Sequence, residues 1–416
     1  MKFYNVLVIF LALNLIACTN TTFTPHRGLI VDNNVSIDKK LNSNITINKS
    51  NENLLNFKKI SLGKRQNSKN ILSAKPIIDG SHIFAMDSVG TLFKVNYDTE
   101  KIEWKFNTNA KSVFSTYPFM IAGGIAINDS AIFVSSSDGT IFKINKDNKK
   151  IFWTSKIDYE IRSNFTVNDK FVFLLSEYDQ VILLDQKSGK NIWETRTSRI
   201  DNNLILGTIP VFALDKDNFI VSTSSGTLEK ITIFDTKAGW VSKIYNQDNS
   251  LGIFSIKSII AEPTYENNFA FVSSIGGETS MIDLESGNKK WSVAVSSKKS
   301  PVVEDNYVFI LEQNTNSIVV INKKSGKPIY KVNLPENYNS KKQVNYTNPI
   351  LININNKNEI AVFSNLGDWV RINPVDGSII SIENNFISRN IVWGPIKLDD
   401  NRFIIQDDNS DLYIFY

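Results

Sequence analysis

The sequence is poor in the residue types that most often build catalytic and metal sites. Its 416 residues include one cysteine and two histidines, which excludes a disulfide framework and a multi-cysteine metal site. His26 and His82 stand alone, and isolated histidines make neither a metal site nor a catalytic triad. The chain also lacks a P-loop, a His-Glu-x-x-His motif and a Gly-x-Ser-x-Gly motif. We therefore expect no enzyme, no cofactor and no metal.

The chain has little net charge and no long amphipathic helical stretch. Lys and Arg number 46 against 42 Asp and Glu, and the lysines are scattered through turns. A nucleic-acid binder would more often gather them into a patch, so we expect no nucleic-acid partner. Apolar residues make up 42% of the chain and aromatic residues 11%. This composition allows a large buried core and argues against wholesale disorder.

The first twenty residues are typical of a targeting segment. Lys2 is followed by about a dozen mostly apolar residues, too few for a membrane-spanning helix but typical of a secretory signal core. The segment ends Leu-Ile-Ala before Cys18. This resembles the lipobox of bacterial lipoproteins, which implies cleavage before Cys18 and lipidation of its thiol; an ordinary signal peptide is the alternative. Thr19 follows instead of the Asp that retains lipoproteins at the inner membrane of enteric bacteria, which favours the outer membrane.

Residues 18 to 50 are rich in Asn, Thr, Ser and Lys. A segment of this composition cannot bury enough apolar surface to order itself, so we expect a disordered, flexible tether. The expected organisation is a signal peptide over residues 1–17, the lipidated cysteine and tether over residues 18–50, and a folded domain over residues 51–416.

A repeated unit of short strands and turns fills the rest of the chain. In IFVSSSDGTIFKINKDNKKIFW, Gly139 marks a turn and Trp153 follows fourteen residues later. Eight such turn positions occur at a mean spacing of about 46 residues, and their residue types tolerate a positive φ, as a tight hairpin requires. They are Gly90, Gly139, Asp179, Gly226, Gly277, Asn316, Gly367 and Ser410.

The period, strand content and turn chemistry predict an all-β fold, an eight-bladed β-propeller of four-stranded antiparallel blades. A further strand, often introduced by Pro, precedes each hairpin, as in AKPIID, YPFMIAGG and GTIPVFAL. The last repeat stops before its outer strand. We expect residues 53–63, from the other end of the domain, to complete that blade and close the ring.

Large aromatic residues recur at one register of the outer strands. They are Trp104, Trp153, Trp193, Trp291 and Tyr330. Because an aromatic side chain buries about 150–250 Å², we interpret them as structural contacts to the neighbouring blade, not as ligand contacts. Trp240 has the same spacing from Gly226 but directly follows Gly239, and that copy carries about three extra residues before Asp235. We interpret the match of Trp240 as accidental.

The element D-x-x-x-G-x-x-x-W, at residues 185–193 and 283–291, resembles the tryptophan-docking repeat of pyrroloquinoline-quinone-type propellers. With the lipobox, the blade count and the length, residues 50–416 resemble the B-subunit lipoprotein family of the bacterial outer-membrane β-barrel assembly machinery. The resemblance implies a scaffold that is not an enzyme and is held in the outer membrane by its lipid, facing the periplasm. It also implies docking on periplasmic domains of the barrel-forming subunit, and help in delivering nascent outer-membrane proteins.

The same resemblance indicates where that partner would bind. In the family, the connection entering the fourth blade carries Leu-x-Leu-Arg. Here Leu204 and Leu206 match the leucines, while Gly207 stands where the arginine is expected. Arg199, a few residues upstream, is the candidate for the missing guanidinium. The family carries an acidic pair in the next such connection, where this chain has only Glu262 nearby. Burial between blades is the alternative role of both leucines.

Two other functions stay open. A propeller lipoprotein that binds a glycan or peptidoglycan would have the same anchor and fold, and co-purification from detergent-solubilised membranes would distinguish it from an assembly scaffold. A quinoprotein-like enzyme would show cofactor absorbance, although such enzymes resemble a larger propeller with adjacent cysteines, which this chain lacks. The acidic segment Asp407–Asp411 lacks the glycine and distal Glu of a calcium loop, so we expect a polar hairpin turn there.

Substitution of Cys18 by Ala should release the protein into the soluble periplasmic fraction or leave the precursor unprocessed. The reason is that stable anchoring requires two or more acyl chains, and lipoprotein acylation begins on the cysteine thiol. Cell fractionation with lipid labelling measures this outcome. A Cys18→Ala protein that stays in the membrane with its lipid label would contradict the prediction.

Overall fold

The computed structural model describes most of the chain beyond the first 55 residues. The described ranges are 56–65, 70–108, 120–121, 123–136, 138–161, 164–176, 179–197, 209–245, 257–312, 315–335, 344–354, 357–384, 386–387, 389–399 and 401–416. Within them every regular element is a β-strand. A search of the same ranges for a helix long and apolar enough to cross a membrane finds none.

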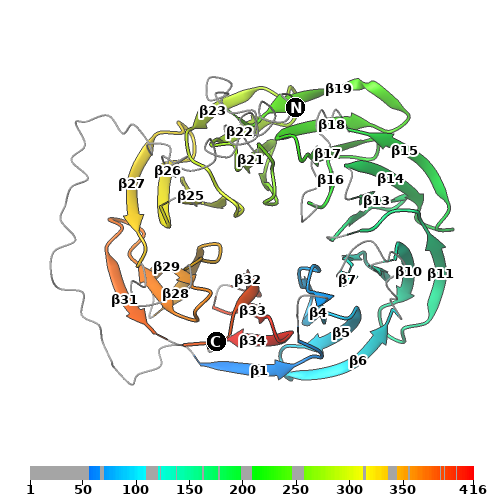
Figure 1. Ribbon diagram of the computed structural model, residues 1–416, viewed down its shortest axis with the longest axis horizontal. Helices are drawn as coiled ribbons and strands as arrows, with labels where there is room; N and C mark the ends of the chain where they lie inside the picture. The colour runs from blue at the N-terminus through cyan, green and yellow to red at the C-terminus, as the bar shows by residue number, and fades with distance from the viewer. Residues whose placement is uncertain are drawn as a thin grey trace, which may run out of the picture.

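Eight four-stranded antiparallel sheets stand in a ring, so the predicted eight-bladed β-propeller is confirmed (Figure 1). The first four blades, written from the innermost to the outermost strand, are β3 (Ile77–Asp79), β4 (His82–Met86), β5 (Thr91–Asn96) and β6 (Lys101–Asn107); β8 (Ile125–Ile127), β9 (Ala131–Ser135), β10 (Thr140–Asn145) and β11 (Ile151–Lys156); β12 (Thr166–Val167), β13 (Phe171–Leu175), β14 (Gln180–Asp185) and β15 (Asn191–Arg196); and β16 (Phe212–Ala213), β17 (Asn218–Ser222), β18 (Thr227–Thr232) and β19 (Asp235–Lys243).

The second half of the ring repeats this order. Blades 5 to 8 are β20 (Thr264–Glu266), β21 (Phe269–Ser273), β22 (Thr279–Asp283) and β23 (Lys289–Val293); β24 (Val302–Glu304), β25 (Tyr307–Glu312), β26 (Ser317–Asn322) and β27 (Pro328–Asn333); β28 (Ile350–Ile354), β29 (Lys357–Phe363), β30 (Trp369–Ile372) and β31 (Ile379–Glu383); and β32 (Ile391–Lys397), β33 (Phe403–Asp407), β34 (Asp411–Phe415) and β1 (Phe57–Ser61).

All eight predicted turn positions have a left-handed backbone. Their φ angles run from +43° at Asn316 to +96° at Gly277. In blade 1, the amide of Gly90 donates to the carbonyl of Asp87 at 3.2 Å, and the amide of Asp87 donates to the carbonyl of Thr91 at 2.9 Å. These bonds are those of a three-residue hairpin loop whose last residue is left-handed. The prediction succeeded because Gly, Asn and Asp are the residue types that adopt this conformation most readily.

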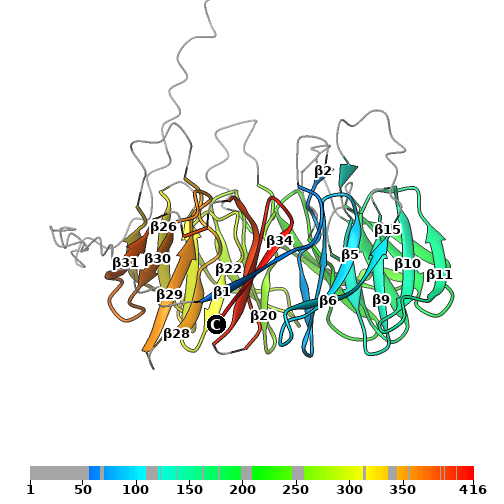
Figure 2. The same ribbon diagram turned by 90° about the horizontal axis from the view of Figure 1, so that it is seen from below.

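The two ends of the domain meet in blade 8. Strand β1 pairs antiparallel with β34 over all five residues, and the two views show it as the outermost strand of that blade (Figures 1 and 2). The side chains of Ile60 and Leu62 are buried, and Lys59 Nζ lies 2.6 Å from the buried carboxylate of Asp411. The N-terminal strand thus occupies the position that the last repeat leaves empty.

The innermost strand of blade 2 is not where the sequence predicts it. The segment YPFMIAGG does not supply it; Met120–Ile121 forms β7, which pairs in parallel with β2 (Asn70–Ile71) outside the blades. Gly123, with φ +92°, separates β7 from the true innermost strand β8. A Cβ atom on Gly123 would lie 2.0 Å from the carbonyl oxygen of Ser135, so this glycine lets the chain turn against β9.

Apolar side chains between neighbouring blades form the core. Among the described residues they form eight clusters, one at each seam of the ring. The second strand of every blade contributes one fully buried phenylalanine: Phe84, Phe133, Phe173, Phe219, Phe271, Phe309, Phe363 and Phe403. Because each blade buries its faces only against its neighbours, the stability of one blade depends on the next.

Two N-terminal truncations should separate the tether from the closing strand. Deletion of residues 19–45 should leave the melting temperature almost unchanged, because the tether expected there would bury little surface. Deletion of residues 19–63 removes Ile60 and Leu62 from the core and exposes the edge of β34, which should cost at least about 3 kcal/mol of unfolding free energy. Thermal and denaturant unfolding measure both, and equal melting temperatures would rule out this closure.

Candidate functional site

The two faces of the ring carry different parts of each blade. The turns between the second and third strands lie on one face, together with the connections from each outermost strand to the next blade. We name this the connection face; the opposite face carries the turns between the third and outermost strands. Figure 2 shows the ring from its edge, with the strands running between the two faces.

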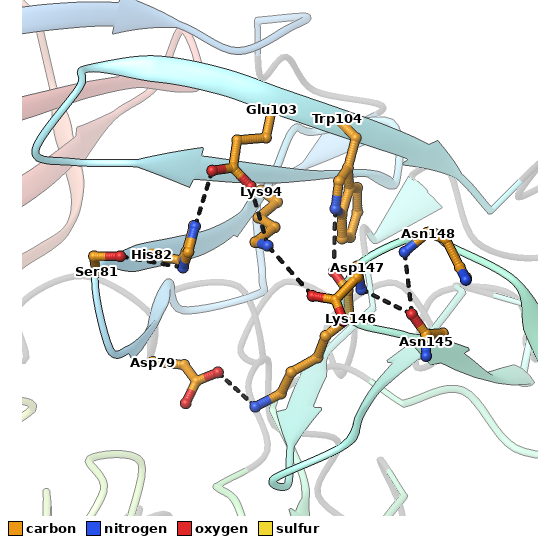
Figure 3. Close-up of polar contacts among 10 residues, drawn as sticks. All are labelled: Asp79, Ser81, His82, Lys94, Glu103, Trp104, Asn145, Lys146, Asp147 and Asn148. Carbon is orange, nitrogen blue, oxygen red and sulfur yellow. Dashed lines mark hydrogen bonds and ion pairs between the residues drawn. The ribbon is translucent and has the colours of Figure 1, made fainter.

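An aromatic side chain on the outermost strand joins one blade to the next. The indole Nε1 of Trp104 in blade 1 donates a hydrogen bond of 3.1 Å to the carbonyl of Lys146 in blade 2 (Figure 3). The hydroxyl of Tyr330 in blade 6 likewise donates to Pro374 in blade 7. The same indole bond recurs at Trp153, Trp240 and Trp291, with the carbonyls of Gln186, Leu284 and Lys323 as acceptors.

A glycine in the receiving turn makes room for the indole ring. Gly189 has a φ of +72°, and a Cβ atom there would lie 2.6 Å from the ring of Trp153. The carboxylate of Asp185 closes the turn by accepting the amide of Ser188 at 2.7 Å. We call this contact between neighbouring blades, an aromatic side chain of one blade against the glycine turn of the next, the joint. The repeat D-x-x-x-G-x-x-x-W therefore contains both halves of a joint. Its Asp and Gly receive the preceding blade, and its Trp, here Trp193, contacts the following one.

The interpretation of Trp240 as an accidental match is wrong. Trp240 pairs with Lys230 in the register of the other docking aromatics, and its indole donates to Leu284 at 3.2 Å. The three extra residues expected before Asp235 are absent, because the chain turns in two residues and β19 starts at Asp235. A Cβ atom on Gly239 would lie 2.1 Å from the Lys230 carbonyl oxygen, so the glycine before Trp240 permits this pairing.

The short turn of blade 4 changes its joint with blade 3. Phe234 lies in this turn with a φ of +62°, and its ring meets the ring of Trp193 edge-on at 6.0 Å. Trp193 also contacts the buried Phe219 at 6.2 Å. Such aromatic pairs contribute about 0.5–1.5 kcal/mol beyond their buried area. Trp193 therefore joins its neighbour through aromatic packing.

The joint between blades 7 and 8 has Ser381 in the aromatic position. Ser381 pairs with Arg371, whose guanidinium forms two hydrogen bonds, of 2.6 and 2.8 Å, with the buried carboxylate of Glu359. Blade 8 receives its outermost strand from the N-terminus, so no turn links its third strand to its outermost strand. An aromatic ring at position 381 would have no such turn to enter.

An ion pair crosses the ring at the connection face. Lys75 precedes the innermost strand of blade 1 and Glu262 precedes that of blade 5, and Lys75 Nζ lies 2.8 Å from the Glu262 carboxylate. The side-chain amide of Asn164, which precedes β12, donates to the Lys75 carbonyl at 2.8 Å. Glu262, the acidic residue nearest the expected partner site, is therefore paired with Lys75. In the connection to blade 6, burial lowers the pKa of Lys299.

Four predicted site residues lie outside the described part of the chain: Cys18, Arg199, Leu204 and Leu206. The two ends of the connection that carries Arg199 and both leucines are described. The amide of Thr197 donates to the carbonyl of Asp179, and Ile209 is buried between blades 4 and 5. The connection thus leaves blade 3 and enters blade 4 at the connection face.

His82 and Glu103 take part in a polar network within blade 1. No group of three or more His, Cys, Asp or Glu in these ranges could hold a metal ion. His82 Nε2 lies 3.0 Å from the Glu103 carboxylate, and Lys94 Nζ lies 3.0 Å from its other oxygen (Figure 3). Hydrogen bonds from His82 and Lys94 hold the pKa of Glu103 below its ordinary value. This network joins the strands of blade 1 near the Trp104 joint.

The acidic segment Asp407–Asp411 is the predicted polar hairpin turn. The carboxylate of Asp407 accepts the amides of Asn409 and Asp411, both at 2.9 Å. Burial raises the pKa of Asp407 above its ordinary value. Arg65, just after β1, places its guanidinium 3.2 Å from Asp408. The segment therefore belongs to the ring closure.

A family model described as outer membrane protein assembly factor BamB matches residues 104–332, more than half of the chain. The chain belongs to the BamB family. The matched span begins at Trp104 and ends two residues after Tyr330, so it contains all five predicted docking aromatics as well as Trp240. The family assignment and the repeated joint therefore concern the same residues.

Individual relatives are distant in sequence. An uncharacterised protein of Rickettsia conorii is 23% identical over 380 residues, 90% of this chain and 86% of that protein. BamB of Yersinia pestis is 20% identical over 343 residues, 82% of this chain and 84% of that protein. The crystal structure of BamB from Moraxella catarrhalis matches with a TM-score of 0.70 at 18% identity, covering 87% of this chain and 99% of that one. At that identity the structural likeness shows the fold alone.

Replacement of Trp240 should reveal the energy of one BamB-type joint. Trp240→Ala should lower the unfolding free energy by about 3 kcal/mol, because it removes a ring packed on Gly287. Trp240→Phe should cost less, about 1–2 kcal/mol, since it loses the hydrogen bond to Leu284 and part of the ring packing but keeps one aromatic ring. The control Val241→Ala, at a side chain 53% exposed, should change the unfolding free energy by less than about 0.5 kcal/mol. Equal effects of Trp240→Ala and Val241→Ala in urea unfolding would contradict this joint.

Proposed function

We propose that this chain is a scaffold lipoprotein, not an enzyme, of the outer-membrane β-barrel assembly machinery. Its task is to aid the assembly and insertion of β-barrel proteins into the outer membrane. The observation that carries the proposal is the BamB family match across the docking aromatics. In this proposal the lipid on Cys18 holds the protein in the outer membrane, and the propeller faces the periplasm.

The ring suits a scaffold because it holds many connections in fixed positions. The joints between blades and the Lys75–Glu262 pair tie several blades together, and loops on a rigid framework are suited to binding. The partner in this proposal is the barrel-forming subunit, bound through its periplasmic domains at the connection face. Nascent outer-membrane proteins are the second class of partner.

The connection between blades 3 and 4 is the proposed contact for the barrel-forming subunit. Leu204 and Leu206 are two residues apart, so in an extended segment both side chains would point to one side. Arg199 would supply the guanidinium. The intramolecular pairing of Glu262 with Lys75 supports a contact that depends on the leucines more than on an acidic pair.

Alanine substitutions at Leu204 and Leu206 test this contact. As binding hot spots, each should contribute about 2 kcal/mol, a weakening of about 30-fold in affinity for the barrel-forming subunit. The melting temperature should stay unchanged. Pull-down from detergent-solubilised membranes and thermal unfolding measure the two quantities. Val375→Ala, on the opposite face and 82% exposed, is the control that should affect neither.

The reverse result would indicate that both leucines are buried core residues. In that case each substitution would cost about 2–5 kcal/mol of stability while pull-down at low temperature persisted. Co-purification of glycan or peptidoglycan in place of the assembly subunits would favour a ligand-binding lipoprotein. Absorbance from a bound quinone in the purified protein would favour an enzyme.

A further inference from the structure

The outermost strands of blades 1, 2 and 3 form a continuous flank on the outside of the ring. They are β6, β11 and β15, which lie next to one another along the right-hand side of Figure 1. We name this surface the basic flank and define it by the exposed side chains of these strands and of the turns that precede them. Its exposed lysines that form no ion pair with a described residue are Lys101, Lys105, Lys149, Lys150, Lys187 and Lys190.

The lysines of the basic flank carry uncompensated charge. The ion pairs of blades 1 and 2 use other lysines, namely Lys94, Lys146 and Lys156. The six flank lysines form no ion pair with a described residue. Three exposed acids of these blades pair with other cations: Glu103 and Asp147 with Lys94, and Asp98 with Arg402. Glu194 accepts hydrogen bonds from the neutral amides of Gln180 and Asn191, so its charge remains, but the six lysines outnumber it. The flank is therefore positively charged overall.

Apolar side chains lie beside these lysines in the sequence and on the surface. Ile102, Ile151, Phe152 and Ile192 are between 39% and 51% exposed, and they occupy the first two positions of the three outermost strands. Lysine is a close sequence neighbour in each strand, as in Lys101-Ile102 and Lys150-Ile151-Phe152. Lysine next to exposed Ile and Phe is the combination that binds the interface of an anionic bilayer.

The described part of the chain begins in blade 8, at the end of β1 that lies toward blade 7 and one blade away from this flank (Figure 1). The amide of Asn56 donates to the carbonyl of the C-terminal Tyr416, so the chain enters blade 8 at its outer edge. Blade 8 adjoins blade 1, and Lys58 contacts Glu100 across the seam at 3.4 Å. Cys18 precedes Asn56 by 38 residues. The tether expected from the sequence would, at that length, have an average span of about 35 Å. A tether held at a membrane would keep the flank within reach of the lipid surface.

We propose that the basic flank lies against an anionic phospholipid bilayer. The outer wall of a ring is convex and carries one or two protruding apolar side chains per strand. Such a wall has no groove for an extended peptide, but it can lie against the flat surface of a bilayer. Lysines would contact the lipid phosphates, and Phe152 with its isoleucine neighbours would enter the headgroup region. The ring would then stand on its side, which leaves the connection face open to a protein partner.

Vesicle binding without the lipid anchor tests the proposal. The chain from residue 19 keeps every described contact. It should sediment with vesicles of equal parts phosphatidylglycerol and phosphatidylcholine, and not with vesicles of phosphatidylcholine alone. Binding should weaken in about 0.5 M salt, where screening is strong. The combined variant K149Q/K150Q/K187Q/K190Q should bind more than 100-fold more weakly, since each lysine contributes about fivefold.

Two matched controls distinguish binding through the basic flank from binding through the overall positive charge of the protein. The variant K298Q/K324Q/K327Q/K357Q removes the same charge from exposed lysines of other blades, and its affinity should stay within about twofold of the parent. Phe152→Ser should weaken binding, and Val375→Ser should not. All variants should keep the parent melting temperature, because the altered side chains are exposed. Equal losses in both lysine variants, absence of binding by the parent, or binding only to an acidic protein would overturn the proposal.

Discussion

Burial of each blade against its two neighbours is the constraint on which the rest of the structure depends. A four-stranded sheet of this size has two apolar faces, and the eight clusters of the core lie at the seams between blades. Each second strand supplies one buried phenylalanine, and at five seams an aromatic side chain of the outermost strand adds a hydrogen bond to the next blade. Loss of any one seam would expose two apolar faces at once, so the ring must close.

Closure combines strand pairing with charge neutralisation. The turn of blade 8 buries Asp407, Asp408 and Asp411, and a buried carboxylate without a partner costs several kcal/mol. The cations that meet two of these acids, Lys59 and Arg65, come from the N-terminal segment. The N-terminal strand therefore supplies hydrogen bonds, apolar burial and charge to the same blade. The seam between blades 7 and 8, which has no aromatic joint, is packed by the rings of Phe363, Phe403 and Phe415.

The repeated parts of this fold could be predicted from sequence because they depend on local chemistry. The positive φ of Asp179, Asn316 and Ser410 follows from a hairpin that needs one left-handed residue every blade. Prediction failed where a blade departed from the common turn length. Spacing alone could not show that a two-residue turn keeps Trp240 in register, nor that Gly123 moves the innermost strand of blade 2 beyond Met120–Ile121. Gly239 was the available signal, because a glycine before the aromatic position allows close approach to Lys230.

The candidate site was harder to predict because it depends on contacts between distant segments. Lys75 and Glu262 belong to opposite blades, 187 positions apart, and no local pattern pairs them. The same reasoning applies to the lysines, which are scattered through the sequence but gather on one flank when consecutive outer strands lie side by side. A propeller turns a period in the sequence into neighbouring positions on its outer wall, so residues about one blade apart act together. Function on such a ring therefore depends less on any single motif than on which side chains the period brings to the same side.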